Sequence, residues 1–571
     1  MRIKIIRVAI IGLFLVIVLD LFYIQVVRGR YYYFLSTNNR IRIVPLEGWR
    51  GKIYDRNGVT LADSRIAYNV MVAPKGMHEH QELFRYLSKV LGVDPRTIER
   101  RYTRNKDAPF APVVVAEDIE RDKAIILEES KYHFPYLIIQ EGYRRTYPQG
   151  ASSAHVLGYV GKVNQARMSQ SKEYGYSPQS IVGYSGVEEF YDSYLKGVEG
   201  GLQIEVNSRG QQVRLLSLKE PTKGQDITLT IDSEIQQIAR ALLTETKGVI
   251  IVMDRDNGEI LGMTSTPGYD PNVFVSSGRE KELSRLFTDP AAPLLNRAIK
   301  GLFPPGSVFK VPIAIGAMDS QKINAHTTFI CKGHYTLGGR DFGCTHVHGP
   351  QDLVQSLIHS CNVYYYHLGT MLGVDVMNKY LQQFGFGQLT YIDLPYEEEG
   401  TLVGRRQRYQ RTKQQWYAGD TLNFAIGQGD TLVTPLQLVR MMATVANSGV
   451  EVHPHVIRAI GGTPVEHYHF RRAVNIDPLA FEDVQKGLRA AVTNFDGTAQ
   501  GLNMEGLYVA GKTGTAQSSG EQEHHAWFVG YVKNAKKNIV FCVLLEHGGS
   551  SQNAVIAAKD LLMGMKEKEI L

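Results

Sequence analysis

The sequence contains little cysteine, and neither sign of charge is in large excess. Only four cysteines occur in 571 residues, too few for a disulfide framework. The formal net charge is only +6 and no dense run of lysine and arginine accompanies it, so we expect no nucleic-acid partner. Low-complexity tracts and solenoid-type repeats are also missing. With 43% hydrophobic residues, these absences exclude a mostly disordered chain, and the length allows several domains.

Long apolar runs are equally scarce, and the one present lies near the N-terminus. Residues Val8–Val27 are apolar apart from Asp20 and Gln25, and twenty helical residues span roughly the 30 Å of a bilayer core. Bulky residues follow without an A-x-A pattern, which disfavours a cleaved signal peptide over an anchor; a buried helix is the other alternative. The sequence predicts a single-pass signal anchor, with residues 1–7 in the cytoplasm and the bulk of the chain on the extracytoplasmic, or periplasmic, side of the cytoplasmic (inner) membrane.

The first large part of the chain after the anchor has a mixed pattern. Residues 28–220 contain strand, turn and short-helix signals, including a hairpin pattern around Asn57-Gly58. They predict a mixed α+β juxtamembrane and pedestal domain. The polar stretch 217–226, which contains proline and glycine, marks its end.

The second large part, residues 227–566, predicts an α+β domain. It begins with an amphipathic helix capped by Asp232 and a hairpin that turns at Asn257-Gly258. Helical patterns dominate from about 307 to 445, and three strands and a last helix follow. This order indicates a sheet sandwiched by helices. Residues 567–571 form a polar tail.

The stretch "LFPPGSVFKVPIAIGAM" (302–318) contains a serine and a lysine one helical turn apart. Two prolines and a glycine break the chain before an apolar helical run, so Ser307 opens the helix and Lys310 lies on the same face. A serine hydroxyl needs an adjacent base, and a lysine can serve only if burial or nearby positive charge leaves it neutral. Alone, this spacing occurs in many ordinary helices.

A second pattern, in "DLVQSLIHSCNVYYYHLG" (352–369), has Ser360 and Asn362 on either side of Cys361, at a break between two helical stretches. A second hydroxyl can relay a proton to a leaving group, and an amide can hold a substrate carbonyl. Serine and asparagine are also common helix caps, so this pattern alone favours no catalytic role.

A third pattern lies on a candidate edge strand, "YVAGKTGTAQ" (508–517). Its polar members are Lys512, Thr513, Gly514 and Thr515. Glycine allows close approach of another backbone, so a peptide could dock along this strand by main-chain hydrogen bonds. The alternative is an ordinary strand with a lysine on its solvated face.

The order of the three patterns along the chain is stronger evidence for a function than any one pattern alone. Ser-x-x-Lys, Ser-x-Asn and Lys-Thr-Gly in this order are similar to the signature of penicillin-binding proteins and serine β-lactamases, whose domain is an antiparallel sheet sandwiched by helices. The anchor and the segments "RGKIYDRNG", "GYSGVEEFYD" and "WYAGDTLNFAIGQGDTLVTPLQL" extend the resemblance to class B penicillin-binding proteins over nearly the whole chain. The last segment resembles the elongation-specific group, penicillin-binding protein 2, more than the division-specific one.

The resemblance implies a peptidoglycan D,D-transpeptidase that acts in elongation and rod-shape maintenance, and a target of β-lactams. Ser307 would attack the carbonyl of the penultimate D-Ala of a stem peptide. Lys310 would take the serine proton, and Ser360 would pass a proton to the leaving amine. Water as acceptor would give a carboxypeptidase side reaction.

The resemblance also assigns substrate-binding roles. Asn362 would hold the substrate amide, Lys512 and Thr513 would bind the terminal carboxylate, and the N–H groups of Thr515 and of the nucleophile would form an oxyanion hole. In this reading Lys310 is neutral in the free enzyme and Lys512 is charged.

The implied partners are stem peptides on lipid-linked or nascent glycan strands, a SEDS-family glycosyltransferase and other membrane proteins of an elongation complex. The alternatives are a division-specific transpeptidase and a penicillin-binding sensor or scaffold without turnover. A β-lactamase is normally soluble and about half this length, so the anchor and the pedestal argue against it.

Three of the four cysteines fall between the first two patterns. They are Cys331, Cys344 and Cys361, and His346 and His348 lie between the last two of them. Thiolates and an imidazole in a closed set of four are typical of structural zinc. The gaps are longer than in a zinc finger, so a Cys331–Cys344 disulfide or unconnected thiols remain alternatives at this point.

The resemblance implies one structural Zn²⁺, because elongation-type relatives carry a zinc site in this interval. The implied ligands are Cys331, Cys344, His348 and Cys361. The chain is shorter than its relatives between the second ligand and the histidine, so Asp341 and His346 are alternates to Cys344. Cys542, in the apolar strand "IVFCVLL", is expected in the core.

Overall fold

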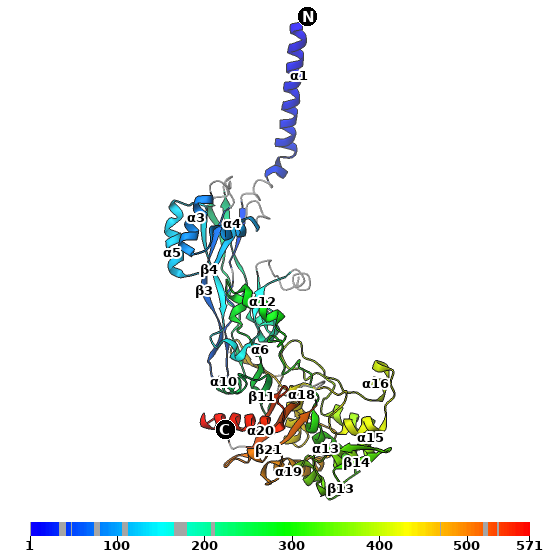
Figure 1. Ribbon diagram of the computed structural model, residues 1–571. Coiled ribbons are helices and arrows are strands. Elements are labelled where there is room, and N and C mark those ends of the chain that lie inside the picture. Colours follow the sequence, from blue (N-terminus) through cyan, green and yellow to red (C-terminus); the bar gives the residue numbers. More distant parts are fainter. Residues whose placement is uncertain are drawn as a thin grey trace. The chain divides into compact units, whose positions relative to one another are not determined.

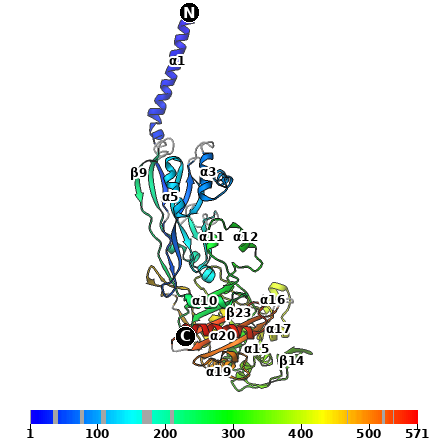
Figure 2. The same cartoon turned by 60° about the vertical axis from the view of Figure 1, so that its left-hand side comes forward.

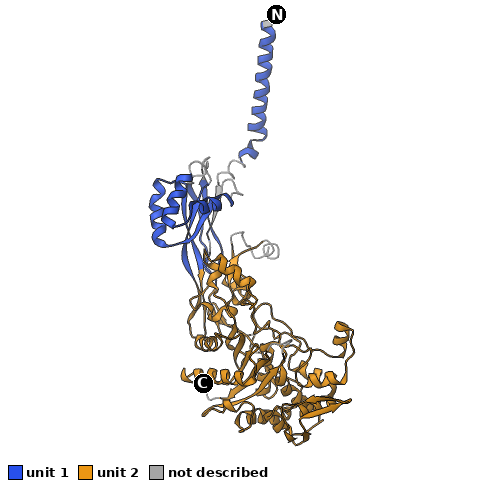
Figure 3. Cartoon of the chain, viewed as in Figure 1, with its two compact units in different colours: residues 1–50, 64–144, 196–224 blue, residues 51–63, 145–195, 225–571 orange. Residues whose placement is uncertain are grey.

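The computed structural model describes the chain except residues 1, 34–40, 47, 74–79, 105–111, 165–179, 207–211, 467, 469, 518–522 and 534–535. The described residues form two compact units (Figure 3). The first comprises residues 1–50, 64–144 and 196–224, and the second comprises residues 51–63, 145–195 and 225–571. The stretch expected as one pedestal domain, residues 28–220, is therefore divided between them.

The N-terminal segment is a single apolar helix. Helix α1 (Arg2–Phe22) continues through one π-helical turn, η1 (Tyr23–Val27) (Figure 1). Residues Ile3–Val27 are long and apolar enough to cross a membrane, and none of the residues in this apolar stretch is buried. This helix is a candidate membrane span, and it includes the run expected as the anchor.

After α1, the described part of the first unit is built on antiparallel strands with the helices α3, α4 and α5. Its elements are β1 (Ile41–Leu46), β3 (Thr60–Val72), α3 (His80–Leu91), α4 (Pro95–Arg104), β4 (Val113–Ile119), α5 (Arg121–Glu129), β5 (Leu137–Thr146), β8 (Gly200–Val206) and β9 (Gln212–Lys219). Both β4 and β5 pair with β3, and β1, β8 and β9 form a separate sheet. Helix α3 buries Leu83 and Leu87, one turn apart, against Val70 and Val115 of the sheet.

The second unit has a central five-stranded antiparallel sheet with the order β12-β11-β23-β22-β21. Its strands are β11 (Gly248–Asp254), β12 (Ile260–Thr266), β21 (Tyr508–Ala516), β22 (His525–Lys533) and β23 (Ile539–Leu545). The hairpin between β11 and β12 turns at Asn257-Gly258 as predicted, and Gly258 has φ +85°, which favours glycine there.

Helices cover both faces of this sheet (Figure 2). Alternate residues of β11 belong to two different cores: Ile250 packs with α10 (Ser233–Leu242) and α20 (Ser551–Glu567), whereas Ile251 packs with the larger core of α13 (Lys310–Asp319) and α18 (Pro435–Ala446). Cys542 of β23 lies in the larger core and is fully buried, as its apolar strand predicts. The expected α+β fold with helices on both faces of a sheet is confirmed.

The remaining elements of the second unit surround this layer. The helices are α6 (Ala154–Leu157), α8 (Gly186–Phe190), α9 (Asp192–Leu195), α11 (Asn272–Val275), α12 (Glu280–Thr288), α14 (Leu353–Ile358), α15 (Asn362–Gln383), α16 (Arg405–Thr412), α17 (Ala418–Ala425) and α19 (Leu479–Thr493). The strands are β2 (Ile53–Tyr54), β6 (Val160–Lys162), β7 (Ile181–Gly183), β10 (Ile227–Leu229), β13 (Phe329–Cys331), β14 (His334–Leu337), β15 (Arg340–Gly343), β16 (Gly349–Gln351), β17 (Val450–Val452), β18 (Ile457–Ile460), β19 (Thr463–Pro464) and β20 (Arg471–Ala473).

The expected helical middle is interrupted by two strand pairs, β13 with β16 and β14 with β15. The turn between β14 and β15 consists of Gly338 and Gly339, both with positive φ, which suits a tight hairpin. These strands are only three or four residues long and mostly exposed, so they lack the apolar alternation by which a longer strand is predicted.

Within the second unit, buried Arg145 joins two segments that carried the family resemblance, those that contain Gly51 and Glu188. Arg145 Nε donates to Glu188 Oε1 at 2.6 Å, and Arg145 Nη1 donates to the carbonyl of Gly51 at 2.7 Å. Tyr147 also donates to Glu188. Because a buried charge is costly unless it is paired and hydrogen-bonded, the pair requires these segments to keep their register.

Candidate active site and metal centre

The candidate nucleophile lies on a tight turn at the start of a buried helix. Ser307 is half-buried in the 3₁₀ turn η6 (Gly306–Phe309), directly before α13. Gly306 has φ +54°, and a Cβ atom there would lie 2.8 Å from the carbonyl oxygen of Thr515. Its N–H donates to the carbonyl of Gly427 at 3.0 Å. Only glycine fits this close approach, which holds the turn of Ser307 against strand β21.

Lys310 joins the first two motifs. Its side chain is completely buried, and Nζ donates to the carbonyl oxygen of Ser360 at 2.6 Å and to Asn362 Oδ1 at 2.7 Å. The Ser360 hydroxyl lies 3.3 Å from the same nitrogen. Burial lowers the pKa of Lys310 to about 8, although the negative charge of the nearby Cys344 thiolate works in the opposite direction. A substantial neutral fraction is therefore present near neutral pH.

The second motif lies at the break between α14 and α15, as the sequence predicts. Ser360 adopts a left-handed conformation with φ +53°, which is uncommon for a residue other than glycine. The Asn362 side chain donates from Nδ2 to the carbonyl of Gly343 at 3.3 Å, and its backbone N–H donates to Cys344 Sγ at 3.2 Å. The loop that carries this motif is thus fixed to the end of β15.

The third motif is on β21, the last strand of the central sheet, as the edge-strand prediction requires. Lys512 and Thr513 are buried and Thr515 is exposed. At Gly514, a Cβ would lie 3.0 Å from Val308 Cγ2 and 3.1 Å from Trp527 Cβ, so the absence of a side chain lets the strand approach the turn of the nucleophile.

The electrostatic state of Lys512 differs from the expectation that it alone is charged. Its complete burial lowers its pKa well below the usual value, and the neighbouring Lys310 lowers it further. Two ammonium groups in one dry site disfavour each other's charge. A bound anion would reverse this penalty, so positive charge on Lys512 depends on what occupies the site.

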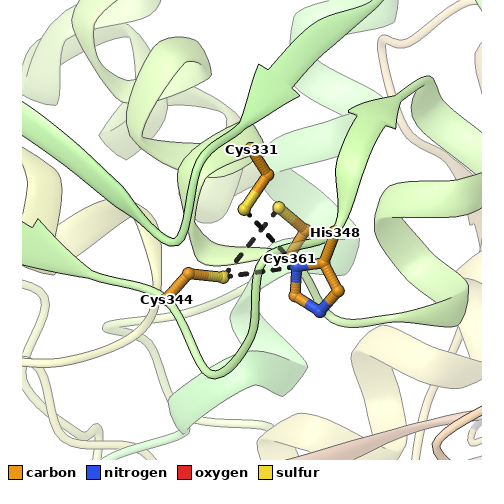
Figure 4. A group of neighbouring side chains, drawn as sticks. All are labelled: Cys331, Cys344, His348 and Cys361. Atoms are coloured by element: carbon orange, nitrogen blue, oxygen red, sulfur yellow. Dashed lines mark hydrogen bonds between the residues drawn. The ribbon is translucent and has the colours of Figure 1, made fainter.

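Four side chains expected as metal ligands lie together beside this site (Figure 4). Their ligand atoms all lie within 4.8 Å of one another: Cys331 from β13, Cys344 after β15, His348 before β16 and Cys361 between α14 and α15. His348 Nδ1 lies 3.5 Å from Cys331 Sγ and 3.6 Å from Cys344 Sγ. All four cysteines of the sequence are described, and none forms a disulfide.

The geometry of this cluster fits a tetrahedral zinc ion. Zn–S bonds of about 2.3 Å require sulfur atoms roughly 3.8 Å apart, and Cys344 Sγ and Cys361 Sγ are 4.0 Å apart. Hydrogen bonding by the Cys361 thiol lowers the pKa of Cys344 to about 3, so the site already favours a thiolate. Of the alternates, Asp341 accepts from Thr336 Oγ1 instead, and His346 is not one of the four clustered side chains.

A second layer of side chains, His359, Gln351 and Asp496, supports this cluster. The ring of His359 stacks on that of His348, with centroids 5.3 Å apart and planes 8° apart. His359 Nδ1 contacts Gln351 Oε1 at 2.8 Å, and its Nε2 contacts Asp496 Oδ2 at 2.9 Å. The backbone N–H of Thr498 donates to the carbonyl of Ile358. The position of His359 next to the Ser-x-Asn motif was the only signal in the sequence.

Comparison with known proteins agrees with this geometry. The family model of the penicillin-binding protein transpeptidase domain matches residues 248–562, and that of the penicillin-binding protein dimerisation domain matches residues 45–229. The chain belongs to the penicillin-binding proteins.

Individual members match almost the whole chain. The peptidoglycan D,D-transpeptidase MrdA of Haemophilus influenzae is 30% identical over 95% of this chain and 88% of its own length. MrdA of Acinetobacter baumannii is 33% identical over 94% of this chain and 83% of its own. The structure of a complex between penicillin-binding protein 2 and MreC from Helicobacter pylori matches with a TM-score of 0.84 and 27% identity, over 93% of this chain and 100% of that one. The resemblance to the penicillin-binding protein 2 group is confirmed.

The contact between His359 and Asp496 generates a test of the second layer. We expect Asp496→Ala to lower the free energy of unfolding by about 1 kcal/mol, the usual net contribution of one hydrogen bond. It should also slow acylation by penicillin, because the loop before Ser360 loses its anchor. Asp496→Asn, which retains an acceptor oxygen, is the matched control. Chemical denaturation and acylation kinetics measure both effects; three indistinguishable proteins would contradict this role.

Proposed function

We propose that this penicillin-binding protein is the peptidoglycan D,D-transpeptidase of cell elongation and rod-shape maintenance. It would cross-link stem peptides through an acyl-enzyme on Ser307, with release of D-Ala. One observation carries the proposal: a buried lysine, one turn after Ser307, bonds both Ser360 and Asn362 beside an edge strand that can accept a peptide. The names of the MrdA relatives support the same reaction.

In the acylation step, the Ser307 oxygen attacks the carbonyl carbon of the penultimate D-Ala and its proton passes to neutral Lys310. The tetrahedral intermediate collapses when the C–N bond to the terminal D-Ala breaks. Ser360, 3.3 Å from Lys310 Nζ, relays a proton to the leaving amine. The proton taken from Ser307 thus reaches the leaving amine through Lys310 and Ser360. The net change is the replacement of an amide bond by an ester bond.

The substrate would lie along β21 as an additional extended strand. The backbone N–H groups of Ser307 and Thr515 would receive the oxyanion, which typically contributes several kcal/mol. Lys512 and Thr513 would bind the terminal carboxylate, whose negative charge restores the charged form of Lys512. Asn362, held by the carbonyl of Gly343, would orient the substrate amide.

The ester would then react with an amine from a neighbouring stem peptide, which forms the cross-link and frees Ser307. Water in place of the amine gives a carboxypeptidase side reaction. A β-lactam carries a strained amide and a carboxylate in a similar arrangement, so it would acylate the same serine and block the site.

We also propose that one structural Zn²⁺ binds the clustered thiols and imidazole. A closed set of three cysteines and a histidine leaves no open position for water, so the ion supplies rigidity rather than a nucleophile. Cys361 lies between Ser360 and Asn362, and Cys344 Sγ accepts the backbone N–H of Asn362. The positions of Cys344 and Cys361 in the cluster therefore help to fix the positions of Ser360 and Asn362.

The N-terminal helix would anchor the protein as a single pass in the cytoplasmic membrane, with the catalytic unit on the extracytoplasmic side. As partners we propose a SEDS-family glycosyltransferase and other membrane proteins of the elongation complex. Two solved relatives support this: one was determined with MreC, and another is described as a peptidoglycan synthase complex that coordinates polymerization and crosslinking, at 30% identity over 99% of this chain and a TM-score of 0.75.

The reaction is tested by labelling with penicillin. Ser307→Ala should abolish covalent labelling and D-Ala release while the protein stays folded, because Ser307 is half-buried and lies outside the apolar core. Ser320→Ala, at the other end of helix α13, is the control and should label normally. Intact-mass spectrometry reads the adduct. Stoichiometric labelling of folded Ser307→Ala would refute the assignment.

The zinc proposal makes a separate prediction. Purified protein should contain one zinc per chain, and Cys331→Ala should lose it, with a lower melting temperature and slower acylation together. Cys542→Ala, which removes a buried cysteine outside the cluster, should keep its zinc. Elemental analysis and thermal unfolding measure these effects. A stable, fully active protein without zinc would disprove the proposal.

A further inference from the structure

Helix α16 has a composition that packing does not explain. Its sequence, RRQRYQRT, includes four arginines, and none of its residues is buried. It is held to the unit by three ion pairs: Arg405 with Asp375, Arg408 with Asp420 and Arg411 with Asp430. A short helix that is polar on all sides contributes little to a core, which favours a role at the surface. Figure 1 shows α16 at the periphery of the catalytic unit.

Cations and aromatic rings share this surface. Three exposed cations have no carboxylate partner among the described residues: Arg340, Arg406 and Lys413. Tyr409 and Tyr417 are 56% and 66% exposed. Together with Phe342, these residues define what we call the α16 surface.

Within each segment of the α16 surface, a cation lies over an aromatic ring. Arg340 lies over the ring of Phe342 at 5.5 Å, and Lys413 lies over the ring of Tyr409 at 5.9 Å. A Cβ at Gly419, at the start of α17, would lie 3.0 Å from Phe342 Cζ. The β14–β15 hairpin therefore meets the first turn of α17.

Strand β15, which carries Arg340 and Phe342, and helix α17, which directly follows Tyr417, also lead into the catalytic motifs. Strand β15 ends at Gly343, whose carbonyl accepts from Asn362. Helix α17 is followed by Gly427, whose carbonyl accepts from Gly306, and by Gln428, whose Nε2 donates to the carbonyl of Thr515 at 3.4 Å. A ligand on the α16 surface would thus flank the position of the scissile peptide.

We propose that the α16 surface binds the nascent glycan strand through the carboxylates of its stem peptides and the apolar faces of its sugars. This inference rests on the proposed transpeptidase function. Arginine and lysine pair with carboxylates, and exposed tyrosines offer rigid apolar faces with a polar edge, on which sugar rings can stack. An anionic lipid surface suits the charge but not the composition, because α16 has no aliphatic face to insert into a membrane.

The test compares two triple variants of the full-length protein in detergent. The first is Arg406→Gln, Lys413→Gln and Tyr417→Ala. The control is Lys322→Gln, Lys559→Gln and Phe470→Ala, which removes the same charge and one exposed ring elsewhere in the unit. The probes are fluorescent uncross-linked glycan strands with pentapeptide stems, the same strands with amidated carboxylates, and phosphatidylglycerol vesicles.

We expect the first variant to bind the strands about tenfold more weakly than wild type, from two lost ion pairs and one lost ring. The control should bind like wild type, and amidation of the strands should weaken binding by wild type more than it weakens binding by the first variant. Penicillin acylation should be equal in all three proteins, because the substituted residues lie outside the catalytic motifs.

Equal strand binding by the first variant and wild type would overturn the inference, as would a loss of vesicle binding alone, which would indicate a lipid surface. Failure of the proposed function gives a different result: wild type would then release no D-Ala from the pentapeptide strands, whatever its strand binding.

Discussion

Burial of the Lys310 ammonium group is the constraint on which the catalytic geometry depends. A completely buried lysine is unfavourable as a cation unless acceptors surround it. Here the carbonyl of Ser360 and the amide oxygen of Asn362 accept from Nζ, and Ser360 takes a left-handed conformation to present both groups. The same burial lowers the pKa of Lys310 to about 8, so the interaction that fixes the second motif also prepares the base.

The cluster of Cys331, Cys344, His348 and Cys361 also holds the loop that carries Ser360 and Asn362. It draws together the ends of β13, β15 and β16 and the loop between α14 and α15, which are short elements with little core of their own. The negative charge of the Cys344 thiolate raises the pKa of Lys310 against the effect of burial. The cluster thus influences both the position of Ser360 and the protonation of Lys310.

Local patterns in the sequence predicted the elements that depend on local chemistry. The hairpin at Asn257-Gly258, the Asp232 cap of α10 and the break before Asn362 all follow from turn and cap preferences. The four clustered ligands were implied by resemblance rather than by spacing. Long-range pairs were missed, such as His359 with Asp496, which are 137 residues apart. The lowered pKa of Lys512 was also missed, because it depends on burial that no local pattern reveals.

The most direct test of this account is the pH dependence of acylation by a β-lactam that does not titrate in the range studied. The base must be neutral, and a pKa near 8 means that its neutral fraction rises from about pH 7 to about pH 9. The groups facing Lys310 are Lys512, Cys344, Cys361 and the ring of Tyr365, and burial keeps the tyrosine neutral by raising its pKa. The account predicts a rate that increases with pH, with a midpoint near 8, and then levels off. A midpoint near 10.5, the ordinary value for lysine, or a rate independent of pH would contradict it.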